Sequence, residues 1–191
     1  MHIDHERGFA FIHIPKTGGT SVIRALAGDQ VPIDHGIAGP KQASELLRAC
    51  FVRDPLTRFV SAFRYSVQLS LRKDGKFVSD KHPVREFIAS QHLTDINTFA
   101  REAAQRGPEW LFQNIHFRPQ IEWLSHSRPQ FIGRFEAMDQ DFARLCMAMG
   151  VPVPRLGRHR VAKKKLDAAP TDETTALIAD WYAEDYRFLG Y

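Results

Sequence analysis

Three short apolar runs, each leading into a helical pattern, constrain the fold of this chain more than any other feature. They are residues 8–14 (GFAFIHI), 49–55 (ACFVRDP) and 130–136 (QFIGRFE). The first run has the composition of a buried strand, and the other two are read as further strands. The apolar spacing in the stretches after them is typical of helices. Strands that alternate with helices predict an α/β fold around a mostly parallel sheet.

Capping residues and periodicity predict the other elements. We expect a helix through about residue 27 with Thr20 or Ser21 as its cap, and a short strand over 31–33. Thr171 is predicted to cap the last helix. The helices predicted after residue 30 cover 40–48, 56–71, 83–90, 94–105, 117–125, 137–149 and 171–188.

Composition sets the class of protein and of ligand. The chain has 191 residues, of which 43% are hydrophobic and 25% charged, and these values fit a single globular domain over residues 1–191. Its net charge of +4 suits an anionic ligand such as a nucleotide or an acidic sugar, but equally nucleic acid or a membrane surface.

The two cysteines and the hydropathy pattern bear on the compartment. Cys50 and Cys146 lie among apolar neighbours in no metal-binding spacing, so we expect buried free thiols. No apolar stretch approaches the length of a membrane span, and the N-terminus lacks the layout of a signal peptide. We therefore expect a soluble cytoplasmic protein, although a catalytic fragment of a longer anchored chain would read the same.

The segment PKTGGTS after the first predicted strand has the features of a phosphate-binding loop. Gly18 and Gly19 permit a tight turn and a close approach to an anion, and the N–H groups at the following helix start point at it. Lys16 adds a mobile charge. The hydroxyl groups of Thr17, Thr20 and Ser21 add donors.

This loop does not match the nucleoside-triphosphate pattern, in which lysine follows the glycines. Asp54 is the only acidic residue beside these strand ends, and Pro55 follows it directly, so a magnesium ligand is not evident. A site of this kind must neutralise its anion with protein cations, which argues against a kinase or an ATPase.

The segment FVRDPLTRFVSAF supplies a second candidate anion site. Arg53 ends a predicted strand, and Ser61 lies about two turns into the helix that follows. A guanidinium can grip a phosphate as a planar fork, and a serine hydroxyl can donate to the same group.

Together, FIHIPKTGGTS and FVRDPLTRFVSAF resemble the two donor-binding motifs of sulfotransferases that use 3′-phosphoadenosine 5′-phosphosulfate (PAPS). The nearest likeness is to the carbohydrate-acting branch, which includes heparan sulfate 2-O- and 6-O-sulfotransferases and bacterial relatives. FIGRFEAMDQDF and the closing YAEDYRFLGY resemble later family segments. The resemblance implies a P-loop-like three-layer α/β fold, with a central, mostly parallel sheet flanked by helices.

The resemblance also implies roles for individual residues. The second motif, Arg53 and Ser61, corresponds to the 3′-phosphate site. No metal is implied, and the product nucleotide is 3′,5′-adenosine bisphosphate (PAP). The first motif corresponds to the 5′-phosphosulfate site and comprises Lys16, Thr17, Gly18, Gly19, Thr20 and Ser21.

Sulfuryl transfer needs a cation at the leaving phosphate and a base for the acceptor hydroxyl. Lys16 suits the first role. Histidine is the natural base near neutral pH, and His35 lies between the two motifs, the interval in which the related glycan enzymes carry theirs. His116 is the second candidate. His13, just before the loop, is expected to pack or to bond a backbone group instead.

The segment RLGRHRVAKKK, residues 155–165, is densely basic. It is either a solvated charge run or, as PAPS-using enzymes suggest, a loop that closes on the nucleotide through Arg158 and Arg160. An acidic acceptor or a membrane surface could use the same segment, whereas no nucleic-acid partner is expected.

Three function classes follow. The first is a PAPS-dependent sulfotransferase acting on a hydroxyl of a sugar or glycoconjugate. The second is an ATP-dependent phosphotransferase on a P-loop-like scaffold, against which the position of Lys16 argues. The third is a non-catalytic nucleotide or nucleic-acid binder, against which the combination of Lys16, Arg53 and Ser61 argues.

Overall fold

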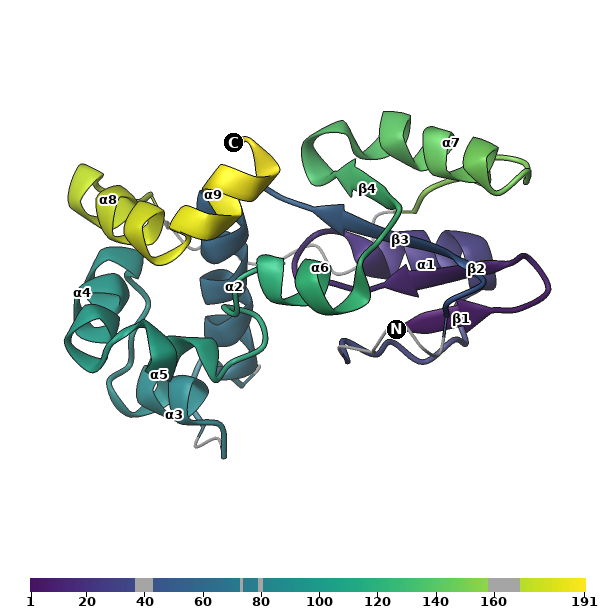
Figure 1. The fold of residues 1–191 in the computed structure, drawn as a ribbon. Coiled ribbons are helices and arrows are strands. Elements are labelled where there is room, and N and C mark those ends of the chain that lie inside the picture. The colour runs from purple at the N-terminus through teal and green to yellow at the C-terminus, as the bar shows by residue number, and fades with distance from the viewer. Residues whose placement is uncertain (37–42, 73, 79–80, 158–168) are drawn as a thin grey trace. The chain divides into compact units, whose positions relative to one another are not determined.

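The computed structural model describes residues 1–36, 43–72, 74–78, 81–157 and 169–191 (Figure 1). The chain forms two compact units. The first comprises Met1–Asp54 and Gln120–Val161, and the second comprises Pro55–Pro119 and Ala162–Tyr191. The prediction that residues 1–191 form a single domain remains a prediction.

The first unit is built on a sheet with the strand order β1-β2-β3-β4. β3 pairs in parallel with β2 on one side and with β4 on the other, whereas β1 is antiparallel to β2. The mostly parallel sheet is therefore confirmed, and β1 is an addition that the sequence did not signal. The strands are β1 (His2–Asp4), β2 (Phe9–Ile12), β3 (Leu47–Val52) and β4 (Phe131–Arg134).

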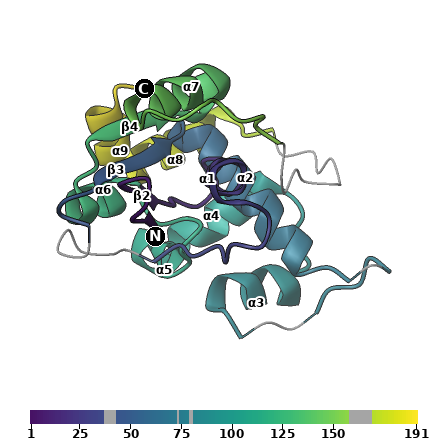
Figure 2. The same cartoon turned by 90° about the vertical axis from the view of Figure 1, so that its right-hand side faces the viewer.

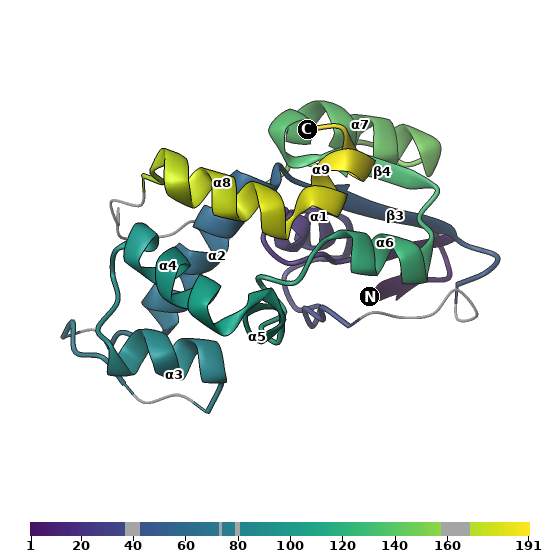
Figure 3. The ribbon, with the colours of Figure 1, turned by 60° about the vertical axis from the view of Figure 1, so that its left-hand side comes forward.

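Helices cover both faces of this sheet. Because side chains alternate along a strand, Phe9 and Phe11 of β2 share a face with Phe51 of β3, and there they pack against α1 (Gly19–Ala27) and α7 (Met138–Ala148). Figure 2 shows α7 beside β4. α6 (Ile121–Ser127) lies over the opposite face (Figures 1 and 3). This is the three-layer α/β arrangement that was expected.

The second unit is helical and has its own core of aromatic residues. Phe59 and Phe63 of α2 meet Phe99 of α4 and Phe117 from the segment that follows α5. α8 packs along α2 and α4 (Figure 3). The helices are α2 (Pro55–Leu69), α3 (Pro83–Ser90), α4 (Ile96–Arg106), α5 (Pro108–Phe112), α8 (Asp172–Trp181) and α9 (Ala183–Leu189).

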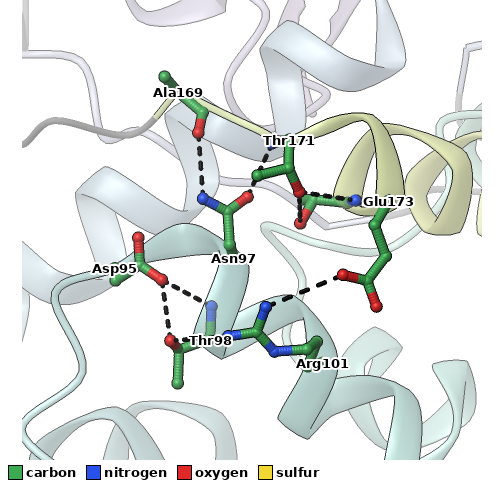
Figure 4. A network of polar contacts seen from close by, with 8 residues as sticks. Asp95, Asn97, Thr98, Arg101, Ala169, Thr171 and Glu173 are labelled. Carbon is green, nitrogen blue, oxygen red and sulfur yellow. Dashed lines mark hydrogen bonds and ion pairs between the residues drawn. The ribbon is translucent and has the colours of Figure 1, made fainter.

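A polar network fastens the start of α8 to the start of α4 (Figure 4). The Asn97 amide donates to the Ala169 carbonyl at 3.2 Å and accepts from the Thr171 N–H at 2.9 Å. Thr171 caps α8 as predicted, since its hydroxyl oxygen accepts from the Thr174 N–H. Asp95 caps α4 in the same way through the Thr98 N–H.

Two of the predicted elements are wrong over the residues that the structure describes. The helix over 40–48 does not form: residues 43–46 make turns, and β3 begins at Leu47. Leu47 and Arg48 pair with β2, and this long-range pairing outweighs their helix propensity. The strand over 31–33 is also absent, although Val31 and Ile33 pack against the core of the first unit.

Several boundaries differ from those expected. Gly18, not Thr20 or Ser21, is the N-cap of α1, and no side chain caps that helix. α6 begins at Ile121, and α5 was not predicted. The last helix is interrupted at Tyr182, a buried residue whose hydroxyl donates to the Phe117 carbonyl in the core of the second unit.

Both cysteines are buried free thiols, as expected. No helix among the described residues is long and apolar enough to span a membrane.

Candidate functional site

The loop between β2 and α1 folds back on itself through two left-handed residues. Lys16 has φ 69° and Gly18 has φ 82°, a region that costs a side chain such as lysine about 1 kcal/mol or more. The Thr17 hydroxyl donates to the Ile14 carbonyl at 2.9 Å, and Thr17 is fully buried. Thr17 therefore braces the turn that presents Lys16, and its hydroxyl proton is engaged inside the loop.

Gly18 ends the loop and starts α1. Its carbonyl accepts from the N–H of Ser21 at 2.9 Å and of Val22 at 3.4 Å. The first turn of α1 contains no acidic residue, so the partial positive charge of the helix start is not offset there. Thr20 is buried and Ser21 half-buried on this same turn.

The structure gives the two glycines a packing role besides the turn. A Cβ on Gly18 would lie 2.4 Å from Met138 Cε and 3.1 Å from the Phe135 ring. A Cβ on Gly19 would lie 2.3 Å from Cδ2 of His13. The buried His13 ring leaves no room for a side chain at Gly19, whereas at Gly18 the positive φ and the Phe135 ring favour glycine.

Arg53 lies at the carboxyl end of β3, next to the loop. Its guanidinium donates from Nη1 to the Lys16 carbonyl at 3.3 Å and stacks over the Phe135 ring, with Cζ 4.2 Å from the ring centroid. Phe135 belongs to a short 3-10 turn (Phe135–Ala137) after β4. The structure thus brings together the two cationic residues that the sequence assigned to separate motifs.

The backbone around Arg53 is held by side chains from distant parts of the chain. Gln120 accepts from the Arg53 N–H at 2.9 Å through Oε1 and donates to the Arg53 carbonyl at 2.8 Å through Nε2. Glu136 accepts from the Asp54 N–H at 2.9 Å. The Glu136 side chain thus helps to hold the main chain at the end of β3.

His35 lies against the loop through His13. The two imidazole rings are 4.2 Å apart between centroids, and His13 is buried against Gly19, as its expected packing role requires. His35 Nδ1 is 3.4 Å from the His13 carbonyl oxygen. A carbonyl only accepts, so a bond here needs the proton on Nδ1, which leaves Nε2 as the basic nitrogen.

The segment that carries His35 is fixed at two further points. The buried Trp123 donates its indole N–H to the His35 carbonyl at 3.2 Å. The Gly36 N–H donates to the Asp34 carboxylate at 2.9 Å. These contacts hold the main chain on both sides of the imidazole.

Ser61 and His116 belong to the second unit. Ser61 is half-buried on α2. His116 contacts the Asn114 side chain through Nδ1 at 3.1 Å, and its ring lies 4.8 Å from that of Tyr65. Their assignments to the 3′-phosphate and to base catalysis remain predictions.

Arg158 and Arg160 lie outside the described residues, so their assignment also remains a prediction. Within the described ranges, no three His, Cys, Asp or Glu side chains form a group that could hold a metal ion.

The sequence did not single out Gln120, Trp123 or Phe135. Each acts on a residue far away along the chain, and no local motif surrounds it. The proline-flanked RPQI segment is the only local feature near Gln120. Such partners become visible only once the chain has folded.

The fold and the site together define an α/β protein that presents cations at the ends of neighbouring parallel strands. Residues 38–191 match the model of the sulfotransferase family, and the chain belongs to this family. The matched region includes Arg53 and begins after the loop that carries Lys16. No curated protein and no solved structure matches the chain.

Proposed function

We propose that this sulfotransferase uses PAPS as its donor and transfers the sulfuryl group to a hydroxyl of a sugar or glycoconjugate, releasing PAP. The observation that carries the proposal is the contact between the two cationic motifs: the Arg53 guanidinium bonds the Lys16 main chain. A donor with phosphate groups at both its 5′ and 3′ positions needs two cationic groups close enough to bind one ligand. The contact of Arg53 with the loop that carries Lys16 supports such a donor.

The residues of the loop fit the 5′ end of such a donor. Lys16, the start of α1 and the Ser21 hydroxyl present positive charge and hydrogen-bond donors to an anion. Thr17 and the two glycines shape the turn from within. Arg53 would hold the 3′-phosphate with Ser61, as the family resemblance implies, and Arg158 and Arg160 remain candidates for the same end of the nucleotide.

When bound, PAPS supplies the activated sulfuryl group. The Lys16 ammonium stabilises the negative charge that develops on the leaving phosphate oxygen. His35 accepts the proton of the acceptor hydroxyl at Nε2, which frees that oxygen to form the new bond to sulfur. The contact between Nδ1 and the His13 carbonyl supports this tautomer. His116 is the alternative base.

The carbohydrate acceptor rests on the resemblance of the two motifs to glycan sulfotransferases. A panel of sugars, glycolipids, other lipids and phenols incubated with labelled PAPS tests it directly. Transfer to sugars supports this acceptor class, and transfer confined to phenols or to other lipids contradicts it.

Calorimetry with PAP and ATP tests the donor. We expect PAP to bind far more tightly than ATP, with no requirement for magnesium. Equal affinity for the two nucleotides, or magnesium-dependent binding of ATP, would instead favour an ATP-dependent phosphotransferase. Tight PAP binding without transfer to any acceptor would favour a non-catalytic nucleotide binder.

A further inference from the structure

We infer that Gln120 is a positioning residue that holds Arg53 for recognition of the 3′-phosphate. Gln120 thereby sets the preference of the site for a nucleotide phosphorylated at that position. This inference rests on the proposed function, because it takes the 3′-phosphate as the ligand of Arg53.

Arg53 lies where the strand pairing of β3 has ended. β3 closes at Val52, whose partner in β4 is Arg134, and its pairing with β2 ends at Cys50. The N–H and carbonyl groups of Arg53 therefore lie beyond the paired region, and no neighbouring strand among the described residues fixes their orientation. A fixed direction here needs another source of hydrogen bonds.

Gln120 supplies both of these bonds with one side chain. Its amide accepts from the Arg53 N–H at 2.9 Å and donates to the Arg53 carbonyl at 2.8 Å, as an adjacent strand residue would. Only one orientation of the amide satisfies both groups, since Oε1 must face the N–H and Nε2 the carbonyl. Gln120 has no exposed surface, so water does not compete for these bonds.

The guanidinium end of Arg53 is held as well. Nη1 bonds the Lys16 carbonyl, and the planar group stacks on Phe135. The Arg53 side chain is thus fixed at its root by Gln120 and at its tip by the loop and the aromatic ring. An arginine held in this way loses less side-chain entropy when an anion binds it, which raises affinity for that anion.

The rival explanation is that Gln120 only stabilises the fold. The two explanations differ in what they predict for ligands that share everything except the 3′-phosphate. Loss of a purely structural bond should weaken PAP and adenosine 5′-monophosphate (AMP) alike. Loss of a residue that positions Arg53 should weaken PAP selectively.

The test therefore measures the ratio of PAP to AMP affinity by calorimetry in the chain of residues 1–191. We expect Gln120→Met, which keeps the length of the side chain and removes both bonds, to lower that ratio about tenfold. An unchanged ratio in the folded variant overturns the inference.

Gln130→Met is the matched control at the other end of β3. The Gln130 side chain accepts from the Arg48 N–H at 2.8 Å, so this change also removes a glutamine bond to the β3 backbone. We expect it to leave the ratio unchanged. A fall equal to that of Gln120→Met would show that any weakening of β3 suffices, and would overturn the inference.

Two further variants keep the result decisive. If circular dichroism shows Gln120→Met to be unfolded, Gln120→Asn replaces it, because an amide one methylene shorter cannot bridge both groups of Arg53. The same outcomes then apply.

Arg53→Ala tests the proposed function separately: if it leaves the PAP to AMP ratio unchanged, Arg53 does not bind the 3′-phosphate. If Arg53→Ala lowers the ratio and Gln120 variants do not, only the inference about Gln120 fails.

Discussion

The Arg53 guanidinium donates a hydrogen bond to the main-chain carbonyl of Lys16, at 3.3 Å. This contact joins the end of β3 to the loop after β2, and Lys16 has a left-handed backbone conformation there. Arg53 therefore helps to hold the conformation of the loop without any bound ligand. The effects of changing either residue should therefore overlap.

Replacing Lys16 should lower turnover more than donor affinity. We expect kcat to fall about 100-fold in Lys16→Ala, because the ammonium stabilises charge that is largest in the transition state. Steady-state kinetics with PAPS and calorimetry with PAP measure the two effects separately.

The control for this change is Lys16→Gly, which removes the ammonium and also relieves the cost of φ 69°. If kcat falls equally in Lys16→Ala and Lys16→Gly, the loss is due to the missing charge. Substantially better activity in the glycine variant would show that the loop conformation is responsible instead.

Arg53→Ala should mainly weaken the donor. We expect PAP affinity to fall about 30-fold, since hydrogen bonds to a charged group are lost, and AMP affinity to change much less. A smaller fall in kcat should accompany it because the bond to the Lys16 carbonyl is also removed. Arg53→Lys keeps the charge without the planar fork and should recover only part of the affinity. Full recovery would contradict a bidentate role.

Replacing His35 should abolish base catalysis without removing the donor. We expect His35→Ala to lower kcat at least 100-fold and to leave PAP affinity close to that of the parent. The loss of rate at acidic pH that protonation of a catalytic base produces should disappear from the residual activity. His116→Ala is the parallel variant: if it loses the transfer and His35→Ala does not, the base is His116.

Gly19→Ala should disturb the histidine pair. The added methyl group would lie 2.3 Å from Cδ2 of the buried His13 ring, and that ring contacts His35. We expect lower kcat together with shifted imidazole resonances of both histidines in NMR spectra.

Gly8→Ala is the control for this variant. Gly8 has φ +67° with open space around it, so alanine there costs about 1 kcal/mol of stability through the backbone alone. The imidazole resonances of His13 and His35 should not shift in the Gly8→Ala variant. The same shifts in both variants would trace the effect to lower stability.

The cap of α4 should make stability depend on pH. The hydrogen bond from the Thr98 backbone N–H, followed by that from its hydroxyl, holds the pKa of the Asp95 carboxyl below its usual value. A lowered pKa in the folded state means that the ionised cap stabilises the protein above the unfolded pKa of about 3.9 and loses this contribution as pH falls through the folded pKa.

Thermal unfolding of Asp95→Ala measures this effect. We expect a loss of about 1 kcal/mol at pH 7 that shrinks below pH 4. Asp95→Asn keeps an acceptor for the Thr98 N–H without a titrating group, so it should remain close to the parent at pH 7 and lack the acid dependence. A pH-independent loss in the alanine variant would contradict the assignment.

The sequence by itself determined the elements whose signals are local. The apolar runs ending near Ile14, Val52 and Arg134 became β2, β3 and β4. β2 and the last four residues of β3 are buried, as a short apolar run in a covered sheet should be, whereas Ile132 of β4 is exposed. The Thr171 cap and the amphipathic α2 were likewise readable from neighbouring residues. Because Lys16 and Arg53 each follow a predicted strand of a mostly parallel sheet, the sequence also implied that both lie at the edge formed by the carboxyl ends of the strands.

Only the tertiary structure decided which distant residues support that edge. Gln120 reaches Arg53, Glu136 reaches Asp54 and Trp123 reaches His35 across long separations in sequence. Strand pairing also turned residues 47–48 from a predicted helix into β3. The physical reason is the same in each case. Hydrogen bonding and burial depend on which distant residues the fold brings into contact, whereas local propensity depends only on neighbours in the sequence.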